Sequence, residues 1–343
     1  MTVVSARLIR AVVPMSVGML ALSACATAAP SGPLEVSAES PLEIVLAVET
    51  TAGDPLADML NLFADKLEAE LGDQVEVTRH LGGAVGNETA TLEALRAGTL
   101  DVVVVGSDIS NLDPTFEIME IPFLFSDRAT VGEFLDGEFG TELSESLTES
   151  TGLRVLSFGE NGFRHVTNNR RPIETPADLA GLKLRVPEVP ARVTTFTRLG
   201  AVPTPMSINE IYISLDQGVL DGQENPLKVI DGFSFDEKQQ YLSLTGHIYS
   251  PAYLTMNAEL FTALPEDVRA VVQTAADEAA QESRDLGEAA DAELITQFEA
   301  GGMTVNEIDT AAFRSAAEEI WTELQAGIPG DYAGRVLDAY AAE

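Results

Sequence analysis

The residues that could carry out chemistry are few, and their spacing argues against catalysis. The three histidines, His80, His165 and His247, are scattered and show no metal-ligand spacing. The sequence contains no Gly-x-Ser-x-Gly elbow, and its single cysteine, Cys25, lies near the start of the chain. The glycine-rich stretch at 81–86 lacks the Gly-Lys-Ser/Thr end of a phosphate-binding loop. The sequence therefore predicts a protein that is not an enzyme and that has no cofactor and no metal site.

Two arginines in apolar surroundings indicate a different activity. Arg164 lies in Gly-Phe-Arg-His-Val-Thr-Asn, and Arg185 lies in Leu-Lys-Leu-Arg-Val-Pro. An unpaired buried guanidinium is costly, so each arginine should have an anionic partner. That partner is either an Asp or Glu of the chain or the carboxylate of a ligand, for which arginine is the preferred fork. For Arg164 the alternatives are a helix end or Glu160.

The overall charge limits the possible partners. The chain has 55 acidic and 20 basic residues, which give a formal net charge of −35. Phosphate binding requires a basic face, so nucleic acid is not an expected partner. A ligand that is itself an anion must be attracted at short range by local arginines, against the field of the whole molecule.

The first 41 residues are predicted to lie outside the folded body. Residues 1–25 have a short basic start, an apolar stretch too short to span a bilayer, and Leu-Ser-Ala-Cys at 22–25. This pattern is typical of a lipoprotein signal peptide with a lipobox, so Cys25 is the expected lipidation site, with ordinary signal cleavage nearby as the alternative. Residues 26–41 have the composition of a flexible tether. A lipid anchor would hold the protein at the outer face of the cell membrane.

About 300 residues remain, enough for two lobes with separate cores. Periodicity predicts strand 43–48, helix 55–71, strand 74–79, helix 88–97 and strand 101–105. This order implies a parallel sheet with right-handed crossovers, and ligands bind beyond the carboxyl ends of such strands. The later predicted elements are helix 128–148, strands 153–158 and 182–186, helices 188–199 and 207–217, and strand 250–257.

One long helix is predicted from Pro265 to Gly301, interrupted by no breaker except Gly287. Such a helix is about 54 Å long, which exceeds one lobe. Two further helices, at 310–326 and 330–341, are expected to pack on the second lobe.

Several sequence blocks in fixed order resemble the DctP family, the extracytoplasmic solute-binding proteins of TRAP transporters. They are Glu-Ile-Pro-Phe-Leu-Phe at 120–125, Gly-Leu-Lys-Leu-Arg-Val-Pro at 181–187, Leu-Gly-Ala-Val-Pro-Thr-Pro-Met at 199–206, Glu-Ile-Tyr at 210–212, Asp-Gly-Gln-Glu-Asn-Pro at 221–226 and Leu-Pro-Glu-Asp-Val at 264–268. The resemblance covers nearly all of the chain after about residue 42. It implies a two-lobe α/β fold, like that of type II periplasmic binding proteins, with the long helix spanning both lobes.

The resemblance also divides the chain and names a partner. Residues 42–161 with 251–290 are expected to form lobe I, and residues 162–250 with 291–343 to form lobe II. The two lobes would close around a ligand and deliver it to the small and large membrane subunits of a TRAP transporter. Presentation of the ligand to a sensor receptor is an alternative that the sequence leaves open.

The resemblance assigns roles to three residues of the second lobe. Arg185 is expected to form a bidentate pair with the ligand carboxylate, Arg164 to help bind the same anion, and Asn225 to donate from the opposite wall. Asn225 could instead only shape the turn before Pro226.

Further ligand contacts are expected from both lobes. The candidates are Glu49 and Thr50 after the first strand, Glu88 at the next helix start, Ser107 and Asp108 after the third strand, Glu160 and Asn161 before Arg164, and Tyr212, with Phe163 and Phe233 as further apolar walls. The sequence departs from the sialic-acid-binding members, which have an asparagine near the place of Glu49 and a glutamate near that of Gly106. Sialic acid is therefore not the expected ligand. Because Glu160-Asn161-Gly162 resembles members that bind sugar acids and other small organic acids, the expected ligand is a sugar acid such as a uronate or aldonate, or a dicarboxylate. Because Glu49 is acidic, a zwitterionic compatible solute such as ectoine is the competing class.

Overall fold

The computed structural model describes residues 34–341, which form an α/β fold around a ten-stranded sheet. The strands are β1 (Leu42–Ala47), β2 (Val75–His80), β3 (Val102–Val105), β4 (Leu153–Asn168), β5 (Lys183–Val186), β6 (Val202–Pro205), β7 (Gly222–Pro226), β8 (Tyr241–Ser243), β9 (Tyr249–Asn257) and β10 (Thr304–Asn306). The α-helices are α1 (Pro55–Leu71), α2 (Glu88–Arg96), α3 (Arg128–Asp136), α4 (Glu138–Thr151), α5 (Pro190–Arg198), α6 (Ile211–Asp216), α7 (Leu227–Gly232), α8 (Ala258–Ala263), α9 (Glu266–Gly301), α10 (Thr310–Gln325) and α11 (Tyr332–Tyr340).

The first half of the sheet is built as the sequence predicts. β1 lies between β2 and β3 and is parallel to both, so β1-α1-β2-α2-β3 forms consecutive parallel crossovers. β3 consists of four valines, all buried, as expected of a parallel strand covered on both faces. β9 then pairs antiparallel with β3 on one side and with β4 on the other.

β4 joins the two halves of the sheet and is much longer than predicted. Its 16 residues pair with β9 over the first part of the strand and with β7 and β8 over the last. The register with β9 shifts between Glu160 and Gly162, and Gly162 has a φ of 122°, which favours glycine. This irregularity lets one strand continue where the sequence predicts an end at residue 158.

The second half of the sheet has the order β4-β7-β5-β6, with β5 parallel to both of its neighbours. β7 contacts β4 closely, because a Cβ at Gly222 would lie 2.1 Å from the carbonyl oxygen of Thr167. The sequence did not predict β6, β7, β8 or β10. β7 in particular has the sequence Gly-Gln-Glu-Asn-Pro and is buried throughout. Because its residues are polar, it lacks the apolar pattern by which buried strands are predicted.

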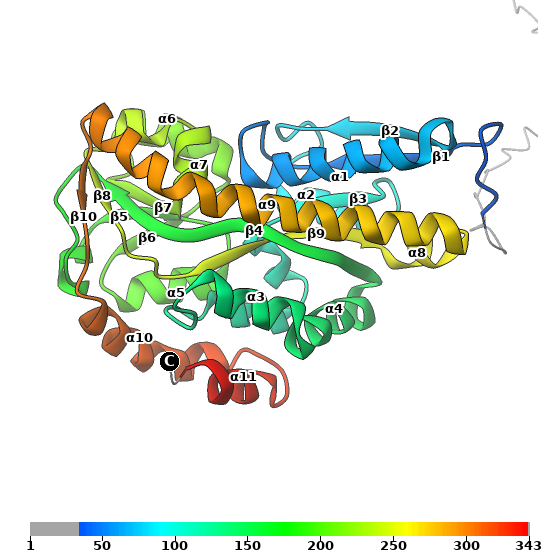
Figure 1. The fold of residues 1–343 in the computed structure, drawn as a ribbon. Coiled ribbons are helices and arrows are strands. Elements are labelled where there is room, and N and C mark those ends of the chain that lie inside the picture. The colour runs from blue at the N-terminus through cyan, green and yellow to red at the C-terminus, as the bar shows by residue number, and fades with distance from the viewer. Residues whose placement is uncertain (1–33, 342–343) are drawn as a thin grey trace, which may run out of the picture. The chain divides into compact units, whose positions relative to one another are not determined.

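The long helix α9 confirms the prediction of one continuous element of 36 residues. It packs on α1 and β4 in its first part and on α7 and β10 near its end, and it runs across both halves of the sheet (Figure 1). Gly287 does not break the helix. A Cβ there would lie 2.4 Å from Cγ of Glu160, so glycine permits the close contact between α9 and β4.

Three other segments differ from the sequence prediction. The helix expected at 128–148 is two helices, α3 and α4, because Gly137 adopts an extended conformation between them. Residues 34–41 were predicted to be part of a flexible tether, yet the Leu34 N–H donates to the carbonyl of Ala263 (2.8 Å), and Leu34 and Val36 pack against the core. The hydroxyl of Tyr332 in α11 donates to the carbonyl of Phe139 (2.9 Å), so this helix contacts the segment predicted as lobe I.

The expected signal peptide, Cys25 and the first part of the tether lie outside the described residues. Within residues 34–341, no helix combines the length and the apolar character needed to cross a membrane. The exact division of the chain between the two lobes stays a prediction.

Candidate functional site

A cleft lies where strands from both halves of the sheet end. Its walls come from the segments that follow β1, β3 and β6, from the middle of β4, and from the ends of β5 and β7. This is the carboxyl edge of the parallel strands, where the sequence predicted the ligand.

Nine of the eleven predicted ligand contacts line this cleft. They are Glu49, Thr50, Glu88, Ser107, Asp108, Asn161, Arg164, Arg185 and Asn225. These residues are spread from position 49 to position 225 of the chain, so their assembly in one cleft is a consequence of the fold.

Arg185 lies near the end of β5 with only 4% of its surface exposed. Its Nε and Nη2 both donate to the carbonyl oxygen of Met206, at 3.0 and 2.7 Å. No carboxylate among residues 34–341 forms an ion pair with it. Burial, with a smaller contribution from nearby Arg164, lowers the pKa of Arg185 to about 10. Within that part of the chain, the guanidinium is thus a buried cation that is held in place without an anionic partner.

Arg164, in contrast, has a partner within the chain. Its Nε donates to Glu224 Oε2 (2.6 Å), and its Nη2 donates to Glu224 Oε1 (3.0 Å) and to Asn225 Oδ1 (2.8 Å). The acidic residue that balances Arg164 is therefore Glu224 and not Glu160, the alternative suggested by the sequence. Arg164 still lines the cleft, but its charge is neutralised before any ligand arrives.

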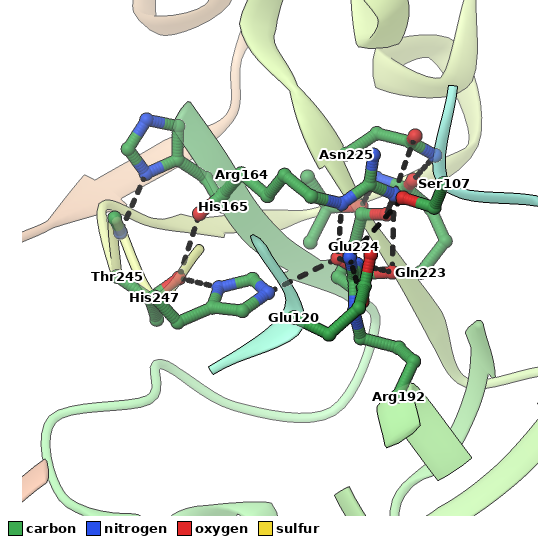
Figure 2. A network of polar contacts seen from close by, with 12 residues as sticks. Ser107, Glu120, Arg164, His165, Arg192, Gln223, Glu224, Asn225, Thr245 and His247 are labelled. Carbon is green, nitrogen blue, oxygen red and sulfur yellow. Dashed lines mark hydrogen bonds and ion pairs between the residues drawn. The ribbon is translucent and has the colours of Figure 1, made fainter. Parts of the chain in front are cut away.

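Glu224 is the centre of a buried polar network, in which the Arg164, Arg192 and His247 side chains converge on one carboxylate (Figure 2). Arg192 Nη1 donates to both oxygens of Glu224 at 2.9 Å, and its Nη2 forms an ion pair with Glu120 (2.6 Å). Although burial opposes ionisation, the two arginines hold the pKa of Glu224 well below its usual range. Burial lowers the pKa of His247, so this ring is neutral and donates from Nε2 to Glu224.

Sequence reasoning missed Glu120, Arg192, Glu224 and His247. The signal for Glu224 was present, because it lies in the Gln-Glu-Asn-Pro block directly before Asn225, which was predicted as a ligand contact. Arg192 carried no comparable signal, since its segment showed only a helical pattern. The network connects η3 (Pro114–Glu120), β4, α5 and β7, so it links Arg164 and Asn225 to two elements outside the sheet, η3 and α5.

The Asn225 side chain is oriented by this network. Its Oδ1 accepts from Arg164, and its Nδ2 donates to Gln223 Oε1. One N–H of the amide remains for a ligand, because the NH₂ group has two donors.

The wall contributed by the first half of the sheet is acidic. Glu49 Oε2 accepts from the Glu88 N–H (3.0 Å), and its Oε1 accepts from the Ser207 hydroxyl, across the cleft. Glu88 accepts from the N–H groups of Gly106 (2.9 Å) and Asp108 (3.2 Å). Burial, with repulsion from neighbouring carboxylates, raises the pKa of Glu88 well above its usual range and that of Asp108 to about 6.

Two predicted contacts lie elsewhere. The Glu160 carboxylate points away from the cleft and binds Arg128, through Nε at 3.0 Å and Nη2 at 2.8 Å, and also accepts from the Tyr249 hydroxyl. Successive side chains of a strand point to opposite faces of the sheet. The Glu160 side chain therefore points toward α9, and the neighbouring Asn161 side chain points into the cleft. The Tyr212 hydroxyl donates to Glu237 (2.9 Å) on the outside of α6 and η6 (Phe235–Lys238).

The apolar part of the lining also differs from the prediction. Phe163 lies in a separate hollow, packed edge-on against Tyr249, and Phe233 stacks on Phe235. The apolar groups that line the cleft are instead Leu56, Pro187, Met206, Ile208 and Val229. In the part of the chain that the structure describes, no three His, Cys, Asp or Glu side chains are arranged to hold a metal ion.

This arrangement can hold a small anion by one end. Arg185 supplies the charge, Asn225 supplies an oriented donor, and the acidic wall offers acceptors for the rest of the molecule. A cleft of this kind, between the two lobes of an α/β protein and with a buried arginine that no carboxylate among residues 34–341 pairs with, is typical of a solute-binding protein.

The chain belongs to the DctP family, the bacterial extracellular solute-binding proteins of family 7, whose model matches residues 46–327. The resemblance noted from the sequence blocks is therefore confirmed. Among its relatives, a solute-binding protein of Verminephrobacter eiseniae is 37% identical over 268 residues, which cover 78% of this chain and 80% of that protein. The 2,3-diketo-L-gulonate-binding periplasmic protein of Escherichia coli is 35% identical over 78% of this chain and 82% of that protein.

Solved structures of TRAP periplasmic solute-binding proteins share the fold. One from Bordetella, with density interpreted as pantoate, has a TM-score of 0.81 and 34% identity, covering 87% of this chain and 99% of that one. One from Roseobacter denitrificans with bound L-galactonate has a TM-score of 0.80 and 31% identity, covering 87% of this chain and 98% of that one. The predicted two-lobe fold with its long helix is thereby confirmed.

Proposed function

We propose that this protein captures a small organic acid in the cleft and delivers it to the membrane subunits of a TRAP transporter. The observation that carries the proposal is Arg185, a buried guanidinium whose only hydrogen-bond acceptor among residues 34–341 is a backbone carbonyl. An anionic ligand would complete its coordination, and a carboxylate matches the geometry of the fork.

The ligand class rests on the relatives and on the cleft together. Solved relatives bind galactonate, D-erythronate and β-D-galacturonate. These compounds combine a carboxylate with several hydroxyls, which suits Arg185 at one end of the cleft and carboxylate acceptors at the other. A sugar acid is therefore the favoured ligand.

The mechanism is a hinge closure without chemistry. Glu49 and Ser207, which belong to different predicted lobes, are joined by a hydrogen bond across the cleft. A ligand that contacts both walls binds the closed form more tightly than the open form and so shifts the population toward it. The membrane subunits would then recognise the closed form.

The lipobox around Cys25 supports a lipid anchor at the outer face of the membrane, which would keep the binding protein close to its transporter. Mass spectrometry of the mature protein tests this proposal. A diacylglyceryl-modified Cys25 at the N-terminus is expected, and an unmodified N-terminus at another residue would rule it out.

The ligand proposal is tested by a thermal-shift screen of aldonates, uronates, keto acids and zwitterions, followed by calorimetry. A ligand at a hundredfold excess over its Kd stabilises the folded protein by about 2.7 kcal/mol. Arg185→Lys should weaken binding of the best acid by about 2–5 kcal/mol, because an ammonium cannot reproduce the planar fork.

The matched control is Arg198→Lys, which changes an exposed arginine of α5 that pairs with Glu323 outside the cleft. This variant should bind like the wild type. Unchanged affinity in Arg185→Lys, or an equal loss in both variants, would refute the role of Arg185 as the carboxylate-binding residue.

A further inference from the structure

The charges that line the cleft are unbalanced once the internal ion pairs are counted. Two arginines line it, and Arg164 is neutralised by Glu224, which leaves Arg185 as the available cation among the described lining residues. The carboxylates that line the cleft are Glu49, Asp54, Glu88, Asp108 and Glu188. A ligand in this cleft therefore meets one free positive charge and a larger number of acidic groups.

Part of this acidic surface is rigidly oriented. We define the acceptor wall as Glu49, Glu88, Asp108 and Asn161. Glu88 is held by two backbone N–H groups, and Glu49 is held by the first turn of α2 and by Ser207. The Thr89 hydroxyl donates to Asp108 Oδ2 (3.1 Å). Each carboxylate offers about four lone-pair positions, so acceptor sites remain after these bonds are counted.

Asn161 provides an independent sign that a ligand belongs at this wall. Its side chain is 8% exposed and lines the cleft, yet its Oδ1 is buried without a hydrogen-bond partner among the described residues. Buried polar atoms in native proteins are nearly always paired, and an unpaired one calls for a missing partner. The wall thus combines an unsatisfied amide oxygen with carboxylates that have spare acceptor sites, so the missing partner must be a donor.

We propose that the ligand is a monocarboxylate whose other end carries hydroxyl groups, and that the acceptor wall excludes dicarboxylates. The inference rests on the proposed function, because it takes Arg185 as the site of the ligand carboxylate. Hydroxyls donate to Glu88, Asp108 and Asn161. A second carboxylate has no proton to donate at neutral pH and would face like charge, with no second free arginine among the described lining residues to receive it.

Matched pairs of acids test the proposal by calorimetry at pH 8. D-galactonate is compared with galactarate, and D-erythronate with meso-tartrate, since each pair differs in the oxidation of one terminal carbon. The aldonate of at least one pair should bind, and it should bind at least tenfold more tightly than its aldarate. An aldarate that binds as tightly as its aldonate would overturn the inference while leaving the Arg185 assignment intact.

Two further outcomes are informative. If neither member of either pair binds, this inference fails, and the proposed sugar-acid function fails with it unless the thermal-shift screen detects a uronate. If 6-amino-6-deoxygalactonate binds at least tenfold more tightly than galactonate, the wall is a cation site and the hydroxyl assignment is overturned.

Variants of the wall separate charge from shape. Asp108→Asn and Glu88→Gln each remove one carboxylate at nearly constant volume and should reduce the preference for the aldonate severalfold. Glu76→Gln, on exposed β2, is the control and should leave the preference unchanged. If both wall variants fold, as judged by circular dichroism, and keep the wild-type preference, the wall does not select the ligand.

The pH adds a readout that a purely structural role would not show. Glu88 interacts electrostatically with Asp108 and Glu49, and Asp108 interacts with Glu49, Arg185 and Glu188. Because burial raises the pKa of Asp108 to about 6, the wall gains protons as the pH falls from 8 to 5. The preference for the aldonate should shrink over this range, and a preference independent of pH would contradict the proposal.

Discussion

At the scale of single residues, the two cleft arginines show how far sequence reasoning reaches. Both were predicted to be buried with an anionic partner, Arg185 at the end of a strand, and both line the cleft with less than 5% of their surface exposed. Only the folded chain shows that Glu224 neutralises Arg164 and that no carboxylate within residues 34–341 pairs with Arg185. The sequence could not distinguish them, because each partner depends on long-range strand pairing between β4, β5 and β7.

Asp54 offers a test of burial at the residue scale. It caps the N-terminus of α1 by accepting from the Leu56 N–H (2.9 Å), and it is 2% exposed. Burial raises the pKa of Asp54 from the usual 3.8 to about 6, so the folded state binds this proton more tightly than the unfolded state. The resulting stability is fully present below pH 3.8 and is lost as the pH rises through 6.

Asp54→Asn keeps the cap but cannot ionise, so it should remove this pH dependence. Relative to the variant, ligand-free wild type should lose about 2 kcal/mol of unfolding free energy between about pH 4.5 and 7.5, measured by urea denaturation. Asp127→Asn is the matched control at the N-cap of α3. The pKa of Asp127 is lowered by bonds from Thr130, so that variant should show no such loss. Parallel stability curves for wild type and Asp54→Asn would contradict the assignment.

At the scale of elements, the sequence predicts helices and strands that have a regular apolar pattern. It misses strands that are stabilised mainly by contacts with distant parts of the chain. The valine strand β3 and the long helix α9 were both foreseen, since each carries its own periodic signal. β7 was not, because its buried residues are Gln223, Glu224 and Asn225, and their polar groups are paired only in the fold. One wall residue of the cleft, Asn225, lies on this strand, where function overrides local preference.

The contact between α9 and β4 gives an element-scale prediction. Gly287→Ala places a methyl group 2.4 Å from Cγ of Glu160, which is held by Arg128 and Tyr249 and cannot easily move. Overpacking of about 1–3 kcal/mol should outweigh the roughly 1 kcal/mol that alanine gains in a helix. The variant should therefore unfold at lower temperature and lower urea concentration than the wild type.

Gly301→Ala is the control on the same helix, because nothing lies within 4 Å of the added methyl group. It should be neutral or slightly stabilising, in accord with helix propensity alone. If Gly287→Ala were as stable as Gly301→Ala, the close packing of α9 on Glu160 would not contribute to the fold.

At the scale of the whole molecule, the proposed closure involves contacts between the two predicted lobes. Lys228 of α7 and Asp58 of α1 form an ion pair (2.8 Å) near the cleft, and neither side chain lines it. The sequence could not predict this pair, since its partners are 170 positions apart. If closure creates the pair, it stabilises the closed state without touching the ligand.

Lys228→Met should therefore weaken ligand binding while leaving the cleft lining unchanged. Methionine keeps the apolar stem of the side chain, so the change isolates the charge. A half-buried pair of this kind contributes roughly 0.2–1 kcal/mol, which lowers affinity up to about fivefold, and the loss should shrink in about 1 M salt, where charges are screened. Arg198→Met, which removes an exposed ion pair between α5 and α10, should change neither the affinity nor its salt dependence.

The measurement is calorimetry of ligand binding at low and at high salt. If Lys228→Met binds the ligand as tightly as the wild type at low salt, either the pair is already formed in the open state or closure is driven by the ligand contacts alone.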